Sequence, residues 1–136
     1  MTASPVRRFG SAHLHDGGFA YGAEVDAKSL IYTAGLSPLD EAGEVVAPDD
    51  PVAQVARTIA CLDVLLAERG AHRDGVAKLT VYVVAADNGA LGQVWQAVDA
   101  AFGGATPPAI VVGVTALPYP GQVVEIEAVV AVGSRS

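Results

Sequence analysis

The chain has 136 residues, of which 51% are hydrophobic and 17% charged, so it is too apolar to stay disordered and long enough to form one domain with a core. Its 15 acidic residues outnumber its 8 lysines and arginines and give a net charge of -7. Because nucleic-acid binding needs a basic surface, this balance argues against a nucleic-acid partner. No apolar stretch reaches membrane-spanning length, so we expect no membrane partner. The apolar composition also favours an oligomer, because a monomer would expose apolar surface.

Two features predict a cytoplasmic location. Cys61 is the single cysteine of the chain, which excludes an internal disulfide and fits a reducing compartment. Arg7 and Arg8 are not followed by an apolar segment, so the N-terminus does not look like a signal peptide. We expect a single domain over 1–136, with an N-terminal segment, 1–18, and a core, 19–132.

The N-terminal segment shows little pattern apart from a candidate short strand over 6–9. His13 and His15 lie beside a Gly-Gly turn, at a spacing that some metal sites use. The next histidine is His72, and zinc sites need three or four ligands. We therefore expect a solvated loop here and no metal.

Two segments, 19–25 and 29–34, are separated by a short link and predict a β-hairpin. The second is rich in residues that favour strands. Gly35 follows it directly, which indicates close approach by another backbone or a ligand.

A helix is predicted after Asp50, because an acidic N-cap followed by Pro51 is a strong start signal. Gly70 is a natural stop. Cys61 is more typical here of a small core residue than of a nucleophile, since no base is patterned near it. Apolar residues recur at spacings of three and four and predict one buried stripe: Val52, Val55, Ile59, Leu62 and Leu66.

The segment 76–86 predicts a strand with Leu79, Val81 and Val83 on one face. Asp87, Asn88 and Gly89 end this strand and offer an N-cap for a second helix. The buried face of that helix is expected to contain Leu91, Val94, Trp95, Val98 and Phe102.

Two apolar segments, 107–118 and 123–130, are joined by a Pro/Gly turn and predict a pair of strands. Glu125 and Glu127 lie inside the second and share a face, which is turned either to water or to a pocket. A carboxylate held in an apolar wall can exchange protons near neutral pH. The candidate acid–base groups are Glu125, Glu127, Tyr21 and Tyr32.

The predicted order is β-β-β-α-β-α-β-β, which favours an α+β fold: a mixed six-stranded sheet with two helices on one face. The other face would need a partner sheet, because the strands are apolar on both sides. The sequence contains no P-loop, dinucleotide fingerprint, zinc signature or Ser-His-Asp arrangement.

Several motifs occur together at spacings typical of one family, and the chain resembles the Rid (YjgF, L-PSP) family from about residue 19 to 132. The resemblance implies a chorismate-mutase-like fold, in which three subunits pack their sheets into a central β-barrel with a small-molecule pocket at each interface. Members of this family with the full motif are enamine/imine deaminases, which hydrolyse 2-imino acids to 2-oxo acids and ammonia. The resemblance therefore implies a hydrolase activity of this kind that needs no cofactor. The motifs are 32–40 (Tyr-Thr-Ala-Gly-Leu-Ser-Pro-Leu-Asp) followed by Gly43-Glu44, then 76–83, Pro108, 112–118 and 124–128.

The resemblance also implies site residues, position by position. Glu125 matches the pocket glutamate of the family and Tyr21 its pocket tyrosine, and these two are the catalytic candidates. Gly35 matches the glycine whose backbone faces the ligand, and Val111 matches a small Cys/Ser position. Asn88 is a further substrate-binding candidate.

Ala109 departs from the family pattern. It lies nine residues before Pro118, where the resemblance places the arginine that binds the substrate carboxylate. Alanine cannot form that bidentate pair, and loss of a desolvated charge partner costs about 2–5 kcal/mol. The run around Tyr21 also lacks the Ser-Gln that follows the tyrosine in the family. We therefore expect a subgroup without the substrate-binding arginine.

Three functions remain open on this basis. The first is a diverged enzyme that hydrolyses or tautomerises a C=N or enamine-type metabolite, with Glu125 as general acid/base and Tyr21 as a second polar contact. The second is a non-catalytic trimer that binds a small metabolite. The third is a residual 2-iminobutanoate/2-iminopropanoate deaminase in which a neighbouring subunit replaces the missing charge. An endoribonuclease, as some family members are labelled, is disfavoured by the net charge of -7.

Overall fold

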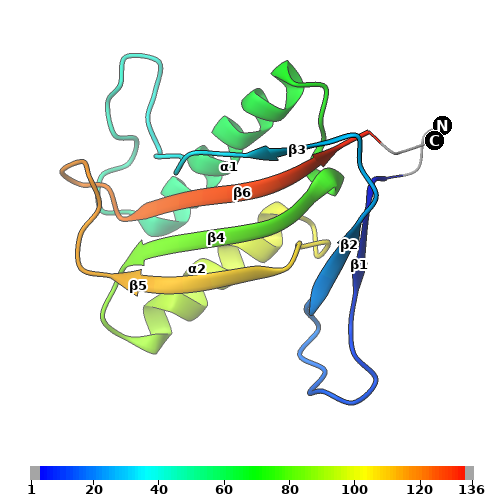
Figure 1. Cartoon of the computed structure of the whole chain (residues 1–136). Coiled ribbons are helices and arrows are strands. Elements are labelled where there is room, and N and C mark those ends of the chain that lie inside the picture. Colours follow the sequence, from blue (N-terminus) through cyan, green and yellow to red (C-terminus); the bar gives the residue numbers. More distant parts are fainter. Residues whose placement is uncertain (1–3, 134–136) are drawn as a thin grey trace.

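The computed structural model describes residues 4–133, so both ends of the domain expected over 1–136 lie outside the described residues. Two helices, α1 (Pro51–Glu68) and α2 (Asn88–Ala101), pack on one face of a four-stranded mixed sheet (Figure 1). β4 is antiparallel to β6 and parallel to β5. The strand order is β3 (Ser29–Tyr32), β6 (Val124–Val132), β4 (Val76–Val84) and β5 (Ala109–Val114). The expected α+β arrangement of two helices on a mixed sheet is confirmed.

The remaining two strands, β1 (Val6–Phe9) and β2 (Gly22–Val25), form a separate antiparallel ribbon beside the sheet (Figure 1). The hairpin predicted from 19–25 and 29–34 is therefore wrong, and the six strands do not form one sheet. The link between them passes from one sheet to the other: the Asp26 amide donates to the Pro5 carbonyl at 2.8 Å, and the Lys28 amide to the Val132 carbonyl at 3.1 Å.

The two C-terminal strands are not paired with each other either. β5 and β6 lie on opposite sides of β4, so the Pro/Gly turn between them passes the end of that strand. There the Val84 amide donates to the Val123 carbonyl at 2.9 Å. Because α2 connects β4 to β5, the chain can return in the same direction and form a parallel pair.

The core lies between the sheet and the helices. Leu79, Val81 and Val83 are buried on β4 as predicted. The α1 stripe is confirmed from Val55 onwards, but Val52, in the first helical turn, is 45% exposed. Trp95 on α2 is half-buried and does not belong to the core cluster. Among the helices of residues 4–133, none is both long and apolar enough to cross a membrane.

Gln54 is a fully buried amide on α1. Its Nε2 donates to the carbonyl oxygens of Ala47 at 3.0 Å and Gly121 at 2.9 Å. Its Oε1 accepts from the amides of Val123 at 2.8 Å and Val124 at 3.2 Å. One side chain thus fastens the loop before α1 to the turn that leads into β6.

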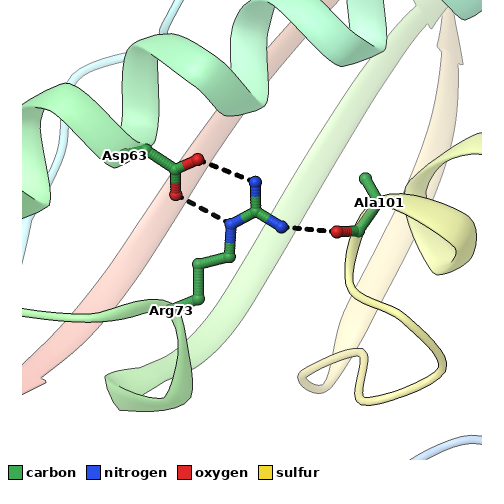
Figure 2. A network of polar contacts seen from close by, with 3 residues as sticks. All are labelled: Asp63, Arg73 and Ala101. Carbon is green, nitrogen blue, oxygen red and sulfur yellow. Dashed lines mark hydrogen bonds and ion pairs between the residues drawn. The ribbon is translucent and has the colours of Figure 1, made fainter.

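Arg73 joins the segment before β4 to both helices, as Figure 2 shows. Its Nε and Nη2 each lie 2.7 Å from a carboxylate oxygen of Asp63 on α1, and its Nη1 donates to the Ala101 carbonyl at the end of α2. The hydrogen bonds to Asp63 raise the pKa of Arg73, outweighing the effect of burial. The guanidinium also stands over the Phe102 ring, 5.4 Å from its centroid.

Arg8 fastens the ribbon to the sheet. Its Nη1 donates to the Ala105 carbonyl at 2.5 Å, and its Nη2 donates to the carbonyls of Arg73 and Val76, both at 3.1 Å. Burial lowers the pKa of this guanidinium, while the charge of Asp74 acts in the opposite direction. The three carbonyls come from two segments, the turn into β4 and the loop after α2, so one planar donor group holds these segments together.

Replacing Arg8 by lysine is expected to lower the free energy of unfolding by about 1–3 kcal/mol, because a single ammonium cannot reach all three carbonyls. Urea denaturation of the full chain measures this. The matched control is Arg7→Lys, since Arg7 pairs with an exposed Glu24 at 2.8 Å and should contribute at most about 0.5 kcal/mol. Equal effects at the two positions would contradict the role given to Arg8.

Candidate functional site

The sheet face opposite the helices is uncovered in the chain (Figure 1). Strand β6 places two carboxylates on that face. Val124 and Ile126 of β6 are buried against the helices, so alternation places Glu125 and Glu127 on the open face. In the ladder with β4, Glu125 lies opposite Tyr82. The alternation therefore confirms that the two glutamates share a face.

Glu125 lies where the chain leaves β3. The backbone of Leu36 pairs with that of Ile126 through hydrogen bonds of 2.7 and 3.1 Å, which brings Gly35 beside Glu125. A Cβ added to Gly35 would lie 2.8 Å from both the Cδ and the Oε2 of Glu125. Ser37 Oγ donates to Glu125 Oε1 at 3.2 Å. Only a glycine leaves room for the carboxylate in this position.

Replacing Gly35 by alanine is expected to displace the Glu125 carboxylate and leave the fold intact. The clash involves the end of a flexible side chain, so the free energy of unfolding should change by less than about 1 kcal/mol. A crystal structure of the variant, together with a thermal melt, checks both parts. A Glu125 side chain that stays in place against the new methyl group would contradict the packing described here.

Glu127 has a different partner. The Tyr82 hydroxyl donates to its Oε1 at 2.9 Å. This hydrogen bond raises the pKa of Tyr82, and burial and the charges of Glu127 and Glu125 act in the same direction. A hollow of about 140 Å³ lies beside Glu127. Its lining residues are Tyr32, Thr33, Lys78, Thr80, Glu127, Ala128 and Val129.

The Tyr82 phenol is expected to titrate above its ordinary value of 10.0. Because the pKa is higher in the folded state than in the unfolded one, the stabilisation by this hydrogen bond is complete below about pH 10 and is lost as pH rises through the folded-state pKa. The phenolate absorbance of the protein minus that of Tyr82→Phe isolates this titration. Glu127→Gln should return it towards the ordinary value, and an unchanged titration in that variant would contradict the assignment.

Neither carboxylate of the open face is paired with a cation within residues 4–133. The ion pairs in that range are Arg7 with Glu24 and Arg73 with Asp63, and both lie elsewhere. Around Glu125 the open face therefore offers hydrogen-bond acceptors and negative charge, whereas the hollow beside Glu127 is also lined by the cation Lys78.

Tyr21 lies apart from Glu125. It precedes β2 in the ribbon, its hydroxyl donates to the His15 carbonyl at 2.7 Å, and its ring centroid is 4.9 Å from that of Phe19. The ribbon is fastened to Val76 at the start of β4, whereas Glu125 pairs near the end of that strand. Six residues of strand span roughly 20 Å, so one chain does not bring the two candidates together.

The other three candidates also lie away from the open face. Ala109 and Val111 of β5 pack against the core on the helix side of the sheet. Asn88 is exposed at the first residue of α2, where Asp87 caps the helix by accepting from the Ala90 amide at 2.8 Å. Of the substrate-binding candidates, Gly35 alone contacts Glu125 within one chain.

Sequence reasoning missed Ser37, Gln122 and Tyr82. Gln122 is 3% exposed, and its Nε2 donates to Ser37 Oγ at 2.9 Å. These residues are distant in sequence from their partners, so no local spacing indicates them. Tyr82 had one signal, since it lies on the face of the predicted strand 76–86 that is opposite Leu79. Within residues 4–133 no group of three or more His, Cys, Asp or Glu side chains could hold a metal ion.

The fold and the site define an α+β domain with two helices on one face of a mixed sheet and paired glutamates on the other. The family model described as Endoribonuclease L-PSP matches residues 17–132. Protein DfrA of Myxococcus xanthus is 33% identical over 113 residues, which cover 83% of this chain and 84% of that protein. The chain belongs to the L-PSP/Rid family.

Solved structures agree with this assignment. YyfB of Yersinia pestis, described as a protein of unknown function of the conserved Rid family, superposes with a TM-score of 0.86 at 27% identity, over 94% of this chain and 99% of that one. A member of the YjgF/YER057c/UK114 family from Mycobacterium tuberculosis gives a TM-score of 0.63 at 26% identity, over 93% and 99% of the two chains.

Proposed function

We propose that this chain is a diverged Rid-family enzyme that hydrolyses or tautomerises a small C=N or enamine-type metabolite without a clamped carboxylate, and that it needs no cofactor. The observation that carries the proposal is the position of Glu125: its carboxylate is held by Ser37 against Gly35 on the open face of the sheet. A positioned carboxylate of this kind is suited to proton transfer. A cytoplasmic location, expected from the single Cys61, suits such a metabolite.

The reaction can be written with one catalytic carboxylate. Glu125 takes a proton from water as the water oxygen attacks the carbon of the C=N bond, and it passes this proton to the nitrogen, which gives a neutral carbinolamine. Glu125 then takes the hydroxyl proton of the carbinolamine as the C=O bond forms and the C–N bond breaks, and it gives this proton to the leaving nitrogen. The balance is one imine and one water consumed, and one carbonyl compound and one ammonia released.

The charge of the site supports a substrate without a carboxylate. Ala109 occupies the position where the family resemblance places an arginine, so the subgroup proposed here lacks that clamp. The face that carries Glu125 also carries Glu127, and no cation pairs with either among the described residues. Lys78 lines the hollow beside Glu127 but forms no ion pair with it, so at Glu125 itself the two carboxylates disfavour an anionic substrate and favour a neutral or cationic one.

A homotrimer is part of the proposal, with three sheets forming a central β-barrel and the site completed at each subunit interface. The open face exposes large apolar side chains, Leu30 at 45%, Tyr32 at 73% and Ile110 at 50%, which a second copy would cover. A neighbouring subunit would also bring Tyr21 to a site that one chain cannot complete. Light scattering that gives a monomer mass would contradict this arrangement.

A non-catalytic metabolite-binding trimer is the second candidate. The observation that favours it is that the other candidate pocket residues offer few free polar groups: the Tyr21 hydroxyl already donates to the His15 carbonyl, and Ala109 and Val111 are apolar. In that case a metabolite would co-purify with the protein, and mass spectrometry would find it unchanged after incubation. Conversion of that metabolite over time would favour the enzyme.

The deciding experiment is hydrolysis of imines released in place by flavin oxidases, with semicarbazide competing for the imine. An active protein lowers the yield of semicarbazone. Faster loss of a carboxylate-free imine supports the proposal. Faster loss of 2-iminopropanoate would instead support a residual 2-imino acid deaminase, and no acceleration with any imine would leave the binding function.

A further inference from the structure

Gln122 lies beneath the candidate site in a fixed orientation. It is 3% exposed, its Oε1 accepts from the Tyr119 amide at 3.2 Å, and its Nε2 donates to the Val124 carbonyl at 3.0 Å. A backbone amide is a donor and a carbonyl is an acceptor, so rotating the side-chain amide by half a turn would oppose donor to donor and acceptor to acceptor. The second proton of Nε2 therefore points to Ser37 Oγ at 2.9 Å.

Ser37 is consequently held as a donor to Glu125. Its oxygen already accepts from Gln122, so its own proton needs an acceptor. Among residues 4–133 that acceptor is Glu125 Oε1, at 3.2 Å. The buried Gln122 thus sets the direction of both hydrogen bonds in this relay: Gln122 donates to Ser37, and Ser37 donates to Glu125.

The two oxygens of Glu125 are therefore not equivalent. Oε1 receives the Ser37 proton, whereas Oε2 accepts no hydrogen bond within the described residues and lies over Gly35. An oxygen that already accepts a hydrogen bond is the poorer proton acceptor of the two.

We infer that Ser37 and Gln122 are positioning residues that hold Glu125 Oε1 as an acceptor and present Oε2 to the reacting water. This inference rests on the proposed function for the identity of the reaction, but the placement of Glu125 can be tested without any substrate. The residues act through Glu125 and do not themselves transfer the proton.

The test uses the full chain with Ser37→Ala, Ser37→Thr and Gln122→Glu, and the probe is the imine that a flavin monoamine oxidase releases from 2-phenylethylamine. Ser37→Ala removes the donor, so crystal structures should show Glu125 in more than one rotamer. Its kcat should fall about tenfold with KM unchanged, because alignment and not binding is lost. Ser37→Thr restores the hydroxyl and should recover both.

Gln122→Glu has the shape of the wild type, but its carboxylate cannot donate to Ser37. The serine proton should turn to the new carboxylate, and Glu125 should again lose its single conformer. A Glu125 that keeps one conformer in both Ser37→Ala and Gln122→Glu would overturn the inference. If the variants displace Glu125 in the crystal but the wild-type protein hydrolyses no imine, the positioning role is upheld and the proposed function is contradicted. Failure of the inference and failure of the proposed function are therefore distinguishable.

Discussion

Replacing Glu125 by glutamine is expected to lower kcat/KM for a carboxylate-free imine by about 100- to 10,000-fold, the usual contribution of a positioned acid–base group. Glutamine has the same shape, and its Oε1 can still accept from Ser37, so the fold and the pocket should persist. What disappears is the oxygen that takes a proton from water and returns it to the leaving nitrogen. The semicarbazide competition assay measures this loss.

The matched control is Glu127→Gln, the same change two residues along the same strand face. Glu127 is bonded to Tyr82 and not to the Ser37 relay, so its loss should affect turnover far less. Unchanged turnover in Glu125→Gln would remove Glu125 from the chemistry. Equal losses at both positions would mean that the charge of the face, and not one acid–base group, governs the rate.

Replacing Gln54 by leucine is expected to lower the free energy of unfolding by about 3–5 kcal/mol. Leucine fills nearly the same volume but leaves the amides of Val123 and Val124 without their acceptor in a fully buried place, while the carbonyls of Ala47 and Gly121 keep one backbone hydrogen bond each. Each such group costs about 1–3 kcal/mol when unpaired, and local rearrangement recovers part of the sum. Urea denaturation of the full chain gives the value.

The control is the same substitution at an exposed glutamine, Gln96→Leu on α2. It should change the free energy of unfolding by at most about 0.5 kcal/mol. A Gln54→Leu variant as stable as Gln96→Leu would show that the turn into β6 does not depend on this amide. Because that turn leads into Glu125, a destabilised variant should also lose turnover.

The sequence predicts well those elements that are marked by a cap residue or by a regular spacing of apolar residues. The N-cap at Asp50 is confirmed, since its Oδ1 accepts from the Ala53 amide at 3.1 Å. The alternation on β4, with Leu79, Val81 and Val83 buried, is confirmed as well. Both follow from residues that lie within a few positions of one another.

Strand pairing was predicted poorly for the same reason. The short link 26–28 is typical of a hairpin, yet its amides donate to the carbonyls of Pro5, just before β1, and of Val132 in β6. Nothing local to β2 indicates that its partner is β1, because pairing depends on where distant segments fold.

The candidate site also combines features that the sequence predicts with features that it does not. That Glu125 and Glu127 share a face follows from alternation alone. The contacts that distinguish them, Ser37 to Glu125 and Tyr82 to Glu127, join segments far apart in the chain and have no sequence signature. Similarly, the sequence identifies the alanine at 109, but only the structure places it against the core.

The central claim is that this chain retains the family glutamate but acts on a substrate without a carboxylate. A matched pair of imines tests it most directly: the imine that an L-amino-acid oxidase forms from phenylalanine, and the one that a flavin monoamine oxidase forms from 2-phenylethylamine. The two differ only in the carboxylate. We predict accelerated hydrolysis of the second, lost in Glu125→Gln, and hydrolysis of the first at the uncatalysed rate. Faster hydrolysis of the phenylalanine imine than of its carboxylate-free counterpart would contradict the account.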